Sequence, residues 1–368
     1  MKKKILLSLF SLLFVLVAGE LFVRNFLRYK DFDAWRKKSI RYAQDGCFGW
    51  KMEPGTYENK RGGIHINALG LRGREIPLQK PSGEFRILVL GGSATFNSKA
   101  EGRKTWPRLL EMKLQDRFGP DVAVLNAGTP GYSAFQSHKR LECDLLQLSP
   151  DLVLVYHLWN DVKYFWWSDA PALTRHLLRQ GEFNQKRTLM LPAWKIPVVD
   201  ELTRYSQLVA RLRFSIIKAL IYTYRIRYEG PGHETLNKQI EPNGVNFYRE
   251  NLLGIRKLLA ERSVPFVIVK QGSLIHSRNV SEERNRIGYA YTGFEHDVLV
   301  EAVQTGWAVN DELCTLEDVS CVAANEELPA ELDYFRDHVH LQQSGLEILS
   351  EVVFQGIAGL IEEKMSDL

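Results

Sequence analysis

Residues 85–96 read FRILVLGGSATF, and this stretch decides the fold. Its apolar run, Ile87-Leu88-Val89-Leu90, ends in Gly91-Gly92-Ser93. A short apolar run bounded by glycine is typical of a buried strand in a parallel sheet. The two glycines permit a tight turn after the strand, so the Ser93 hydroxyl should lie at the carboxyl edge of the sheet. Open α/β folds bind their ligands at this edge.

Outward from this stretch, apolar strands alternate with helical segments. This alternation is typical of a parallel sheet covered by helices on both faces. We therefore predict a three-layer α/β/α domain with a parallel, five-stranded, flavodoxin-like sheet. The expected strands are residues 85–90, 122–125, 152–156, 265–270 and 307–309, and the expected helices are residues 106–118, 134–148, 247–262, 294–305 and 343–365.

Two parts of the chain break the alternation. Residues 28–84 are charged and irregular, which predicts a stalk and an N-terminal extension that packs on the core. Residues 162–243 contain aromatic, basic and helical pieces and a Gly-Pro-Gly break, which predicts a helical insertion over the C-terminal edge of the sheet. The expected organisation is therefore an N-terminal segment at 1–27, the extension at 28–84, and a main domain at 85–368 with its insertion at 162–243.

The N-terminus carries a targeting signal. Lys2-Lys3-Lys4 precedes an apolar run over residues 5–19, a pattern typical of a signal peptide or a signal anchor. The apolar character resumes after Glu20, which gives enough length to span a bilayer, and no clean Ala-x-Ala cleavage site is present. We therefore favour an uncleaved transmembrane anchor. Positively charged residues that flank a membrane span stay on the cytoplasmic side, so the N-terminal lysines should lie there. The rest of the chain should then lie outside the cytoplasm, on the periplasmic or extracellular face.

Composition excludes some partners and fits this compartment. The net charge of +4 in 368 residues comes partly from the N-terminal lysines, so it gives no reason to expect nucleic acid. Four cysteines suit an exported protein. Cys314 and Cys321 are close in a polar stretch and predict a disulfide, whereas Cys47 and Cys143 are either a second bridge or two buried thiols. No Cys/His spacing resembles a zinc site, and we expect neither metal nor cofactor.

Three later groups of polar residues match Ser93 in position, since they follow predicted strands or precede the last helix. They are residues 126–131 (NAGTPG), Asn160-Asp161, and residues 337–340 (DHVH). With Ser93, their order resembles the SGNH/GDSL hydrolase superfamily, whose members carry Ser, Gly, Asn and His in four blocks. The resemblance covers about residues 85–161 and 265–365, and neither the insertion nor the N-terminal extension.

The resemblance implies a Ser-His-Asp triad of Ser93, His340 and Asp337. Serine is a poor nucleophile until a base takes its proton, and His340 is the candidate base. Asp337, three residues earlier, can hold the imidazole in the useful tautomer. The implied oxyanion hole consists of the backbone N–H groups of Ser93 and Gly131 and the side-chain amide of Asn160.

Each member of this set has an ordinary structural alternative. Ser93 can cap the following helix, Gly131 can serve a turn, and Asn160 can bond its own loop. His338 is the nearest rival base, but only His340 has an aspartate three residues before it. The coincidence of four groups in the family's order favours the catalytic interpretation.

Two positions depart from the family pattern. Gly92 stands where the family's name motif has aspartate, and Leu158 stands where the third block usually has glycine. Neither change removes a catalytic group. The bulky pair Leu158-Trp159 predicts a reshaped pocket mouth.

These observations predict an exported, membrane-anchored serine esterase that removes acyl groups, such as acetyl, from a glycan or lipid. The aromatic loop after Asn160 is suited to stacking on sugar rings. One alternative is a polysaccharide O-acyltransferase with the same site, in which a sugar replaces water as the acceptor. Another is a non-catalytic glycan-binding assembly subunit, against which the intact triad argues. Nucleotide binding at Gly91-Gly92 lacks both the third glycine of a dinucleotide fingerprint and a P-loop lysine.

Overall fold

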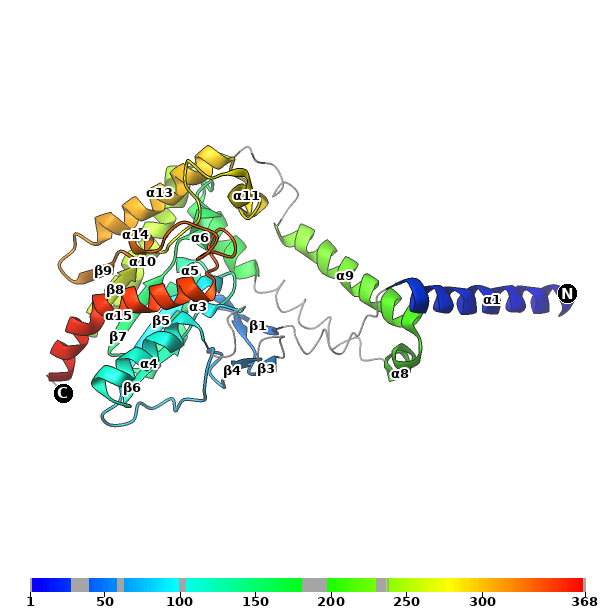
Figure 1. Cartoon of the computed structure of the whole chain (residues 1–368), viewed down its shortest axis with the longest axis horizontal. Helices are drawn as coiled ribbons and strands as arrows, with labels where there is room; N and C mark the ends of the chain where they lie inside the picture. Colours follow the sequence, from blue (N-terminus) through cyan, green and yellow to red (C-terminus); the bar gives the residue numbers. More distant parts are fainter. Residues whose placement is uncertain are drawn as a thin grey trace.

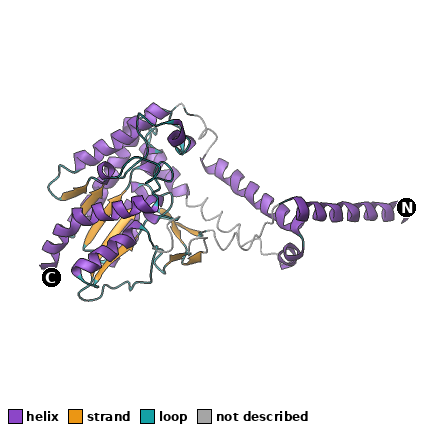
Figure 2. Cartoon of the chain, in the orientation of Figure 1, coloured by secondary structure: helices purple, strands orange, loops and turns teal. Residues whose placement is uncertain are grey.

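The centre of the molecule is a five-stranded parallel sheet. A computed structural model describes residues 2–27, 40–57, 63–98, 104–180, 197–229, 236 and 238–366. The strand order is β6-β5-β7-β8-β9, which confirms the predicted flavodoxin-like arrangement (Figures 1 and 2). The strands are β5 (Phe85–Gly91), β6 (Val122–Asn126), β7 (Leu152–Tyr156), β8 (Phe266–Val269) and β9 (Val319–Val322).

Helices cover both faces of this sheet. On one face α4 (Trp106–Phe118) packs against α15 (Gln343–Ser366), and on the other lie α5 (Ala134–Arg140), α10 (Pro242–Ala260) and α13 (His296–Leu313) (Figure 1). Every residue of β5, β6, β7 and β8 is buried, as continuous apolar strands require. The three-layer α/β/α architecture is therefore confirmed. Short helices α3 (Ser93–Phe96), α6 (Trp159–Val162), α11 (Ser281–Arg284), α12 (Tyr289–Thr292) and α14 (Ala324–Glu327) lie in the connections.

The fifth strand lies elsewhere than the sequence predicts. Residues 307–309 belong to α13, because its buried residues Leu299, Val303 and Val309 recur at helical spacing. The edge strand is β9, in which only the two terminal valines are buried. Because β9 has only four residues and no clear alternation of apolar and polar side chains, its sequence does not indicate a strand. The fifth strand is therefore predicted at the wrong place.

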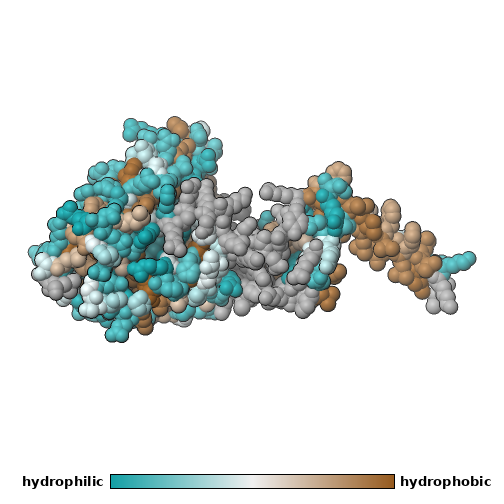
Figure 3. Space-filling view, turned by 60° about the horizontal axis from the view of Figure 1, so that its bottom comes forward, coloured by the Kyte–Doolittle hydropathy of each residue, from teal (hydrophilic) through white to brown (hydrophobic). Residues whose placement is uncertain are grey.

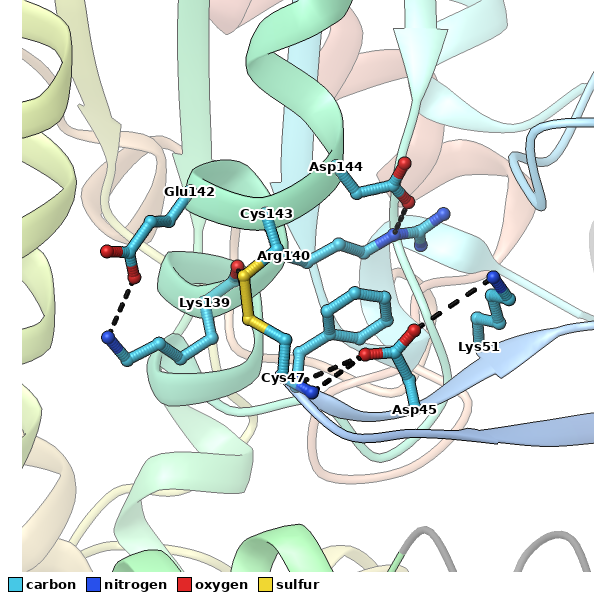
Figure 4. The surroundings of a disulfide bond; sticks show 9 residues. Asp45, Cys47, Lys51, Lys139, Arg140, Glu142, Cys143 and Asp144 are labelled. Atoms are coloured by element: carbon cyan, nitrogen blue, oxygen red, sulfur yellow. Dashed lines mark hydrogen bonds and ion pairs between the residues drawn. A yellow bond between two sulfur atoms is a disulfide. The ribbon is translucent and has the colours of Figure 1, made fainter.

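Two disulfides are present. Cys314–Cys321 confirms the predicted bridge, and Cys47–Cys143 is a bridge rather than a pair of thiols. Cys47 lies between β1 (Tyr42–Asp45) and β2 (Gly49–Met52) of the N-terminal extension. Cys143 lies in a π-helical turn, Leu141–Leu145, which with a 3₁₀ turn (Leu146–Leu148) replaces the second half of the helix predicted over 134–148. This bridge ties the extension to the main domain (Figure 4).

The extension also joins the sheet by hydrogen bonds. Its second hairpin pairs β3 (Gly55–Tyr57) with β4 (Ile64–Ile66). Arg72 bridges Ile66 to Asn126, and its backbone N–H donates to the Asn126 carbonyl at 3.0 Å. The free edge of β6 is therefore partly covered by the chain that precedes β5.

The N-terminal helix stands apart from the main domain. α1 (Lys2–Phe26) is long and apolar enough to cross a membrane, and its surface is exposed (Figure 3). α15 passes the same test of length and composition but is partly buried in the domain. In the insertion, α9 (Gln207–Glu229) packs on α8 (Pro197–Tyr205) and on α1, and it leads away from the sheet (Figure 1). This helix of the predicted insertion therefore does not lie over the sheet edge. Residues 181–196 and 230–235 of the insertion, and residues 28–39 of the predicted stalk, lie outside the described residues.

We expect the Cys47–Cys143 bridge to stabilise the protein more than the Cys314–Cys321 bridge. It closes a loop of 96 residues instead of 7, and chain entropy then gives about 5 against about 2 kcal/mol. Urea unfolding of the double variant Cys47→Ser/Cys143→Ser should show the larger loss, with Cys314→Ser/Cys321→Ser as the matched control. Equal losses would contradict the view that the long bridge holds the extension in place.

Candidate active site

Three loops leave the sheet at the same level. β5 pairs with β6 as far as Val89–Asn126 and with β7 as far as Gly91–Tyr156. The residues that follow these strands therefore emerge side by side at the carboxyl edge. They are the first three polar groups predicted from the sequence.

The fourth group completes a Ser–His–Asp chain at this edge. His340 Nε2 lies 2.8 Å from Ser93 Oγ, although the two residues are 247 positions apart. His340 Nδ1 lies 2.8 Å from Asp337 Oδ1. The turn is closed by the His340 backbone, whose N–H donates to Asp337 Oδ1 at 3.0 Å and whose carbonyl accepts from the Arg336 N–H at 2.8 Å. The structure thus brings the three predicted triad residues together.

The Asp337 carboxylate is ionised at neutral pH. Burial by itself would raise its pKa, but the hydrogen bond and charge of His340, with the charge of His338, lower the pKa well below its usual range. A carboxylate at Nδ1 holds the imidazole with its proton on that nitrogen. His340 Nε2 is then free to accept the Ser93 hydroxyl proton.

His338, the rival base, has a different position and a structural role. Its ring lies on Trp159 with the ring centroids 3.9 Å apart, and its Nδ1 accepts the Gly288 N–H at 3.2 Å. Burial lowers the pKa of His338 to about 4, so the ring is neutral at pH 7. His340, rather than His338, is the residue that bonds to Ser93.

Three N–H donors gather beside Ser93. Within the described parts of the chain, the backbone N–H groups of Ser93 and Gly131 have no acceptor. Asn160 Nδ2 donates one hydrogen to the Tyr132 carbonyl at 2.7 Å, which leaves the second hydrogen available. Gly131 has φ of +86°, a conformation that glycine adopts readily. These donors are the ones that the family resemblance implies for an oxyanion hole.

Close packing explains why glycine stands before the serine. A Cβ on Gly92 would lie 2.6 Å from Asn160 Nδ2 and 3.0 Å from the Tyr132 carbonyl oxygen. Any larger residue would therefore displace the amide that lies over the Ser93 turn. The nearness of Asn160 therefore fits a residue without a side chain at position 92.

Tyr291 is a site residue that the sequence did not reveal. Its hydroxyl donates to Asn160 Oδ1 at 2.9 Å, and its ring stacks on Trp159. Because Oδ1 accepts this bond, the Nδ2 end of the amide faces Tyr132 and the Ser93 turn. Tyr291 lies on α12, outside the four sequence blocks, so no motif pointed to it.

Trp50 is a second residue that sequence reasoning missed. Its ring lies 3.5 Å from the position of a Cβ on Gly131 and meets Tyr132 edge to face, with centroids 5.1 Å apart. The Tyr132 hydroxyl donates to the Trp50 carbonyl. The N-terminal extension thus supports the loop that carries Gly131. Nothing in the irregular composition of residues 28–84 signals this role.

The aromatic residues around Asn160 form walls and core. Trp159 and Phe165 are buried, and the Trp166 ring is covered by the Lys238 ammonium at 3.4 Å. The Leu158 side chain packs on α13, where a Cβ on Gly306 would lie 2.1 Å from it. Leu158 and Trp159 both line the small cavity beside Ser93, in agreement with the predicted reshaping of the pocket mouth, and stacking of this loop on sugar rings stays a prediction.

A second Ser–His–Asp arrangement lies inside the domain. Ser137 Oγ is 2.7 Å from His157 Nε2, but His157 Nδ1 is 3.7 Å from Asp161 Oδ2, too far for a hydrogen bond. All three residues are at most 4% exposed. Burial lowers the pKa of His157 to about 3 and raises that of Asp161 to about 8, so both are neutral at pH 7. Asp161 Oδ1 accepts the Ala134 N–H at 2.8 Å, which indicates a structural role.

The space beside Ser93 is small. A cavity of about 10 Å³, lined by residues that include Ser93, Asn160 and Val339, has room for about one water-sized group. A larger cavity of about 570 Å³ lies between the N-terminal extension, the edge strand β6 and α4, and none of the triad residues lines it. The candidate site is therefore identified by its reactive side chains and not by the size of its cavity. Among the described residues, no cluster of His, Cys, Asp or Glu is arranged to hold a metal ion.

No family model and no curated protein matches the sequence. Among solved structures, the chain is similar to a GDSL-like lipase from Bacteroides thetaiotaomicron, with 12% identity, a TM-score of 0.41, and coverage of 76% of this chain and 92% of the other. It is similar to the lipase/acylhydrolase from Enterococcus faecalis, with 15% identity, a TM-score of 0.41, and coverage of 75% and 96%. It is also similar to an acetyl xylan esterase, with 11% identity, a TM-score of 0.42, and coverage of 74% and 100%.

The Tyr291 hydroxyl should matter for turnover and not for folding. Tyr291→Phe keeps the ring stack and removes one hydrogen bond, so we expect ester turnover to fall about 10-fold because Asn160 loses its orientation. Asn160→Ala should cost about 100-fold or more, since it removes a donor. The double variant should be no slower than Asn160→Ala alone. Additive losses in kcat/KM would mean that Tyr291 acts elsewhere.

The pKa of Asp161 predicts a pH dependence of stability. A raised native pKa gives stability that is complete below pH about 4 and is lost as pH rises through about 8. His157 acts in the opposite sense, but only below its ordinary pKa of 6.5. Urea unfolding of the wild type should therefore show falling stability from pH 6.5 to 8.5. Asp161→Asn, which keeps the acceptor for Ala134, should remove most of this slope.

The exposed residue Asp116 provides the control for this measurement. Asp116→Asn should leave the slope between pH 6.5 and 8.5 unchanged. An unchanged slope in Asp161→Asn would show that another group is responsible.

Proposed function

We propose that this chain is an exported, membrane-anchored serine esterase of the SGNH/GDSL type. The observation that carries the proposal is the hydrogen-bonded chain from Ser93 through His340 to Asp337. The uncommitted N–H donors of Ser93, Gly131 and Asn160 beside it supply the second requirement of acyl transfer. A binding protein would require neither.

In the acylation step, His340 Nε2 takes the Ser93 proton while Oγ attacks the ester carbonyl carbon. The carbonyl oxygen becomes an oxyanion that accepts hydrogen bonds from the Ser93 and Gly131 N–H groups and from Asn160. The bond to the alcohol then breaks. The departing alkoxide takes the proton from His340, and Ser93 retains the acyl group.

Deacylation runs the same steps with water as the nucleophile. Water loses a proton to His340 and attacks the acyl carbon, and the proton then returns to Ser93 Oγ as the free acid departs. The Asp337 carboxylate stabilises the imidazolium that forms twice in each cycle. Because a sugar hydroxyl can replace water in this step, product analysis separates hydrolysis from transfer.

The acyl group that fits best is a short one such as acetyl. The cavity beside Ser93 has a volume of about 10 Å³, which suits a methyl group better than a fatty chain. The His340 side chain is 30% exposed, so the site opens to solvent on the side of the base. The remainder of the substrate would lie outside, as a glycan or lipid headgroup can.

The N-terminal helix supports the proposed location. α1 begins with Lys2-Lys3-Lys4 and then presents an exposed apolar surface of membrane-spanning length. Positive charge before a single span keeps the N-terminus in the cytoplasm. The catalytic domain would then act on the outer side of the membrane, where two disulfides also persist.

Labelling of the full chain with a fluorophosphonate probe tests the proposal. Because Ser93 is activated and open to the site, we expect labelling of the wild type and none of Ser93→Ala or His340→Ala. Ser137→Ala is the matched control, since Ser137 also bonds to a histidine but is buried, and it should label normally. Persistent labelling in Ser93→Ala would overturn the assignment.

The same preparations should hydrolyse p-nitrophenyl acetate at least about 10-fold faster than the octanoate ester, because the cavity beside Ser93 admits only a small group. Equal rates for the two esters would contradict the proposed preference for a short acyl group, but they would leave Ser93 as the proposed nucleophile.

A further inference from the structure

The anchor helix and the insertion meet at one charged residue. Glu20 of α1 accepts the Gln207 and Leu208 backbone N–H groups, each at 2.9 Å, and the Ser206 hydroxyl at 2.7 Å. These N–H groups are the first of α9, which otherwise lack partners. A carboxylate also interacts favourably with the positive end of a helix dipole. The start of α9 is therefore held to α1 at Glu20.

This junction lies near the end of the apolar part of α1. At 1.5 Å per residue, Glu20 is about 22 Å along the helix from Ile5, and the hydrocarbon core is about 30 Å thick. With the N-terminal lysines at the inner surface, Glu20 lies about 8 Å inside the outer boundary of the core. The residues beyond it, Phe22 and Phe26, are still apolar and are 55% and 75% exposed. The start of α9 is thus in the outer part of the lipid layer, within the roughly 5–10 Å to which an interfacial helix inserts its apolar face.

At this depth α8 presents an apolar face. Val198, Leu202 and Tyr205 follow i, i+4, i+7 spacing and are 69%, 49% and 70% exposed. On α9, Leu212 and Ile216 are likewise exposed at i, i+4 spacing. These side chains are exposed, whereas Ala210, Arg213 and Ile217 on the other face of α9 are buried.

Three facts identify lipid as the occupant of this face. Arg24 of α1 donates to the Tyr205 carbonyl, so the last turn of α8 directly contacts the anchor. The apolar surface of α1 continues to this junction (Figure 3). The first half of α9 has no acidic residue and carries Arg211 and Lys218 outside its buried face, which suits anionic headgroups, whereas α8 has two acidic residues and one basic residue.

We propose that α8 and the first half of α9 form an interfacial platform on the outer membrane surface, with the apolar side chains of Val198, Leu202, Tyr205, Leu212 and Ile216 inserted among the lipids. This inference rests on the membrane anchor proposed above. A single transmembrane helix leaves a domain free to rotate about it. A helix lying in the interface beside the anchor gives the domain one preferred orientation toward the bilayer.

Site-specific fluorescence in lipid nanodiscs tests this proposal with the full chain. All four native cysteines are in disulfides, so an introduced cysteine carries the only free thiol. The variants are Leu202→Cys for the platform, Phe14→Cys for the anchor, and Ser281→Cys on exposed α11 as the water-facing control. Each is labelled with the environment-sensitive dye NBD, with and without spin-labelled lipids that quench on contact.

We expect bright emission with strong lipid quenching at residues 14 and 202, and neither at 281. If residue 202 behaves like 281 while 14 is quenched, the anchor stands and the platform is wrong. Bright emission at 202 without lipid quenching would mean that protein, for example a second copy, covers the face, which also overturns the platform. Absence of quenching at residue 14 would instead refute the anchor itself.

Discussion

The site depends on how closely three backbone turns approach one another at the carboxyl edge of the sheet. A Cβ on Gly91 would lie 2.1 Å from Thr95 Oγ1, and one on Gly128 would lie 2.6 Å from the Phe96 nitrogen. Gly92 has equally little room beside Asn160. Only glycine permits this packing, because any side chain would separate the turns. The N–H donors beside Ser93 are held together by that contact.

Residues outside the motifs maintain this arrangement. Tyr291 orients the Asn160 amide, and Trp50 supports the loop that carries Gly131. Trp50 belongs to an extension that the Cys47–Cys143 bridge ties to the main domain. The extension and α12 are therefore parts of the candidate active site, even though they carry none of the reacting groups. Orientation of a donor matters because its effect depends on where the oxyanion forms.

Two Ser–His–Asp arrangements in this protein differ in how deeply they are buried. Ser93 and Ser137 each bond to a histidine near an aspartate. Around Ser137 the histidine and aspartate are fully enclosed, and burial keeps both neutral. Around Ser93 the carboxylate keeps its charge because His340 bonds to it. The same residue types thus stabilise the fold in one place and are arranged for catalysis in the other.

The sequence by itself determined the sheet, since buried parallel strands are local apolar runs, and it determined the candidate triad through the order of four short motifs. It misplaced β9 and the insertion helix α9, whose positions depend on tertiary contacts more than on local pattern. Only the tertiary structure decided that Cys47 pairs with Cys143, that Tyr291 holds Asn160, and that Trp50 supports the loop of Gly131. These contacts join residues far apart in the chain, and local periodicity carries no record of them.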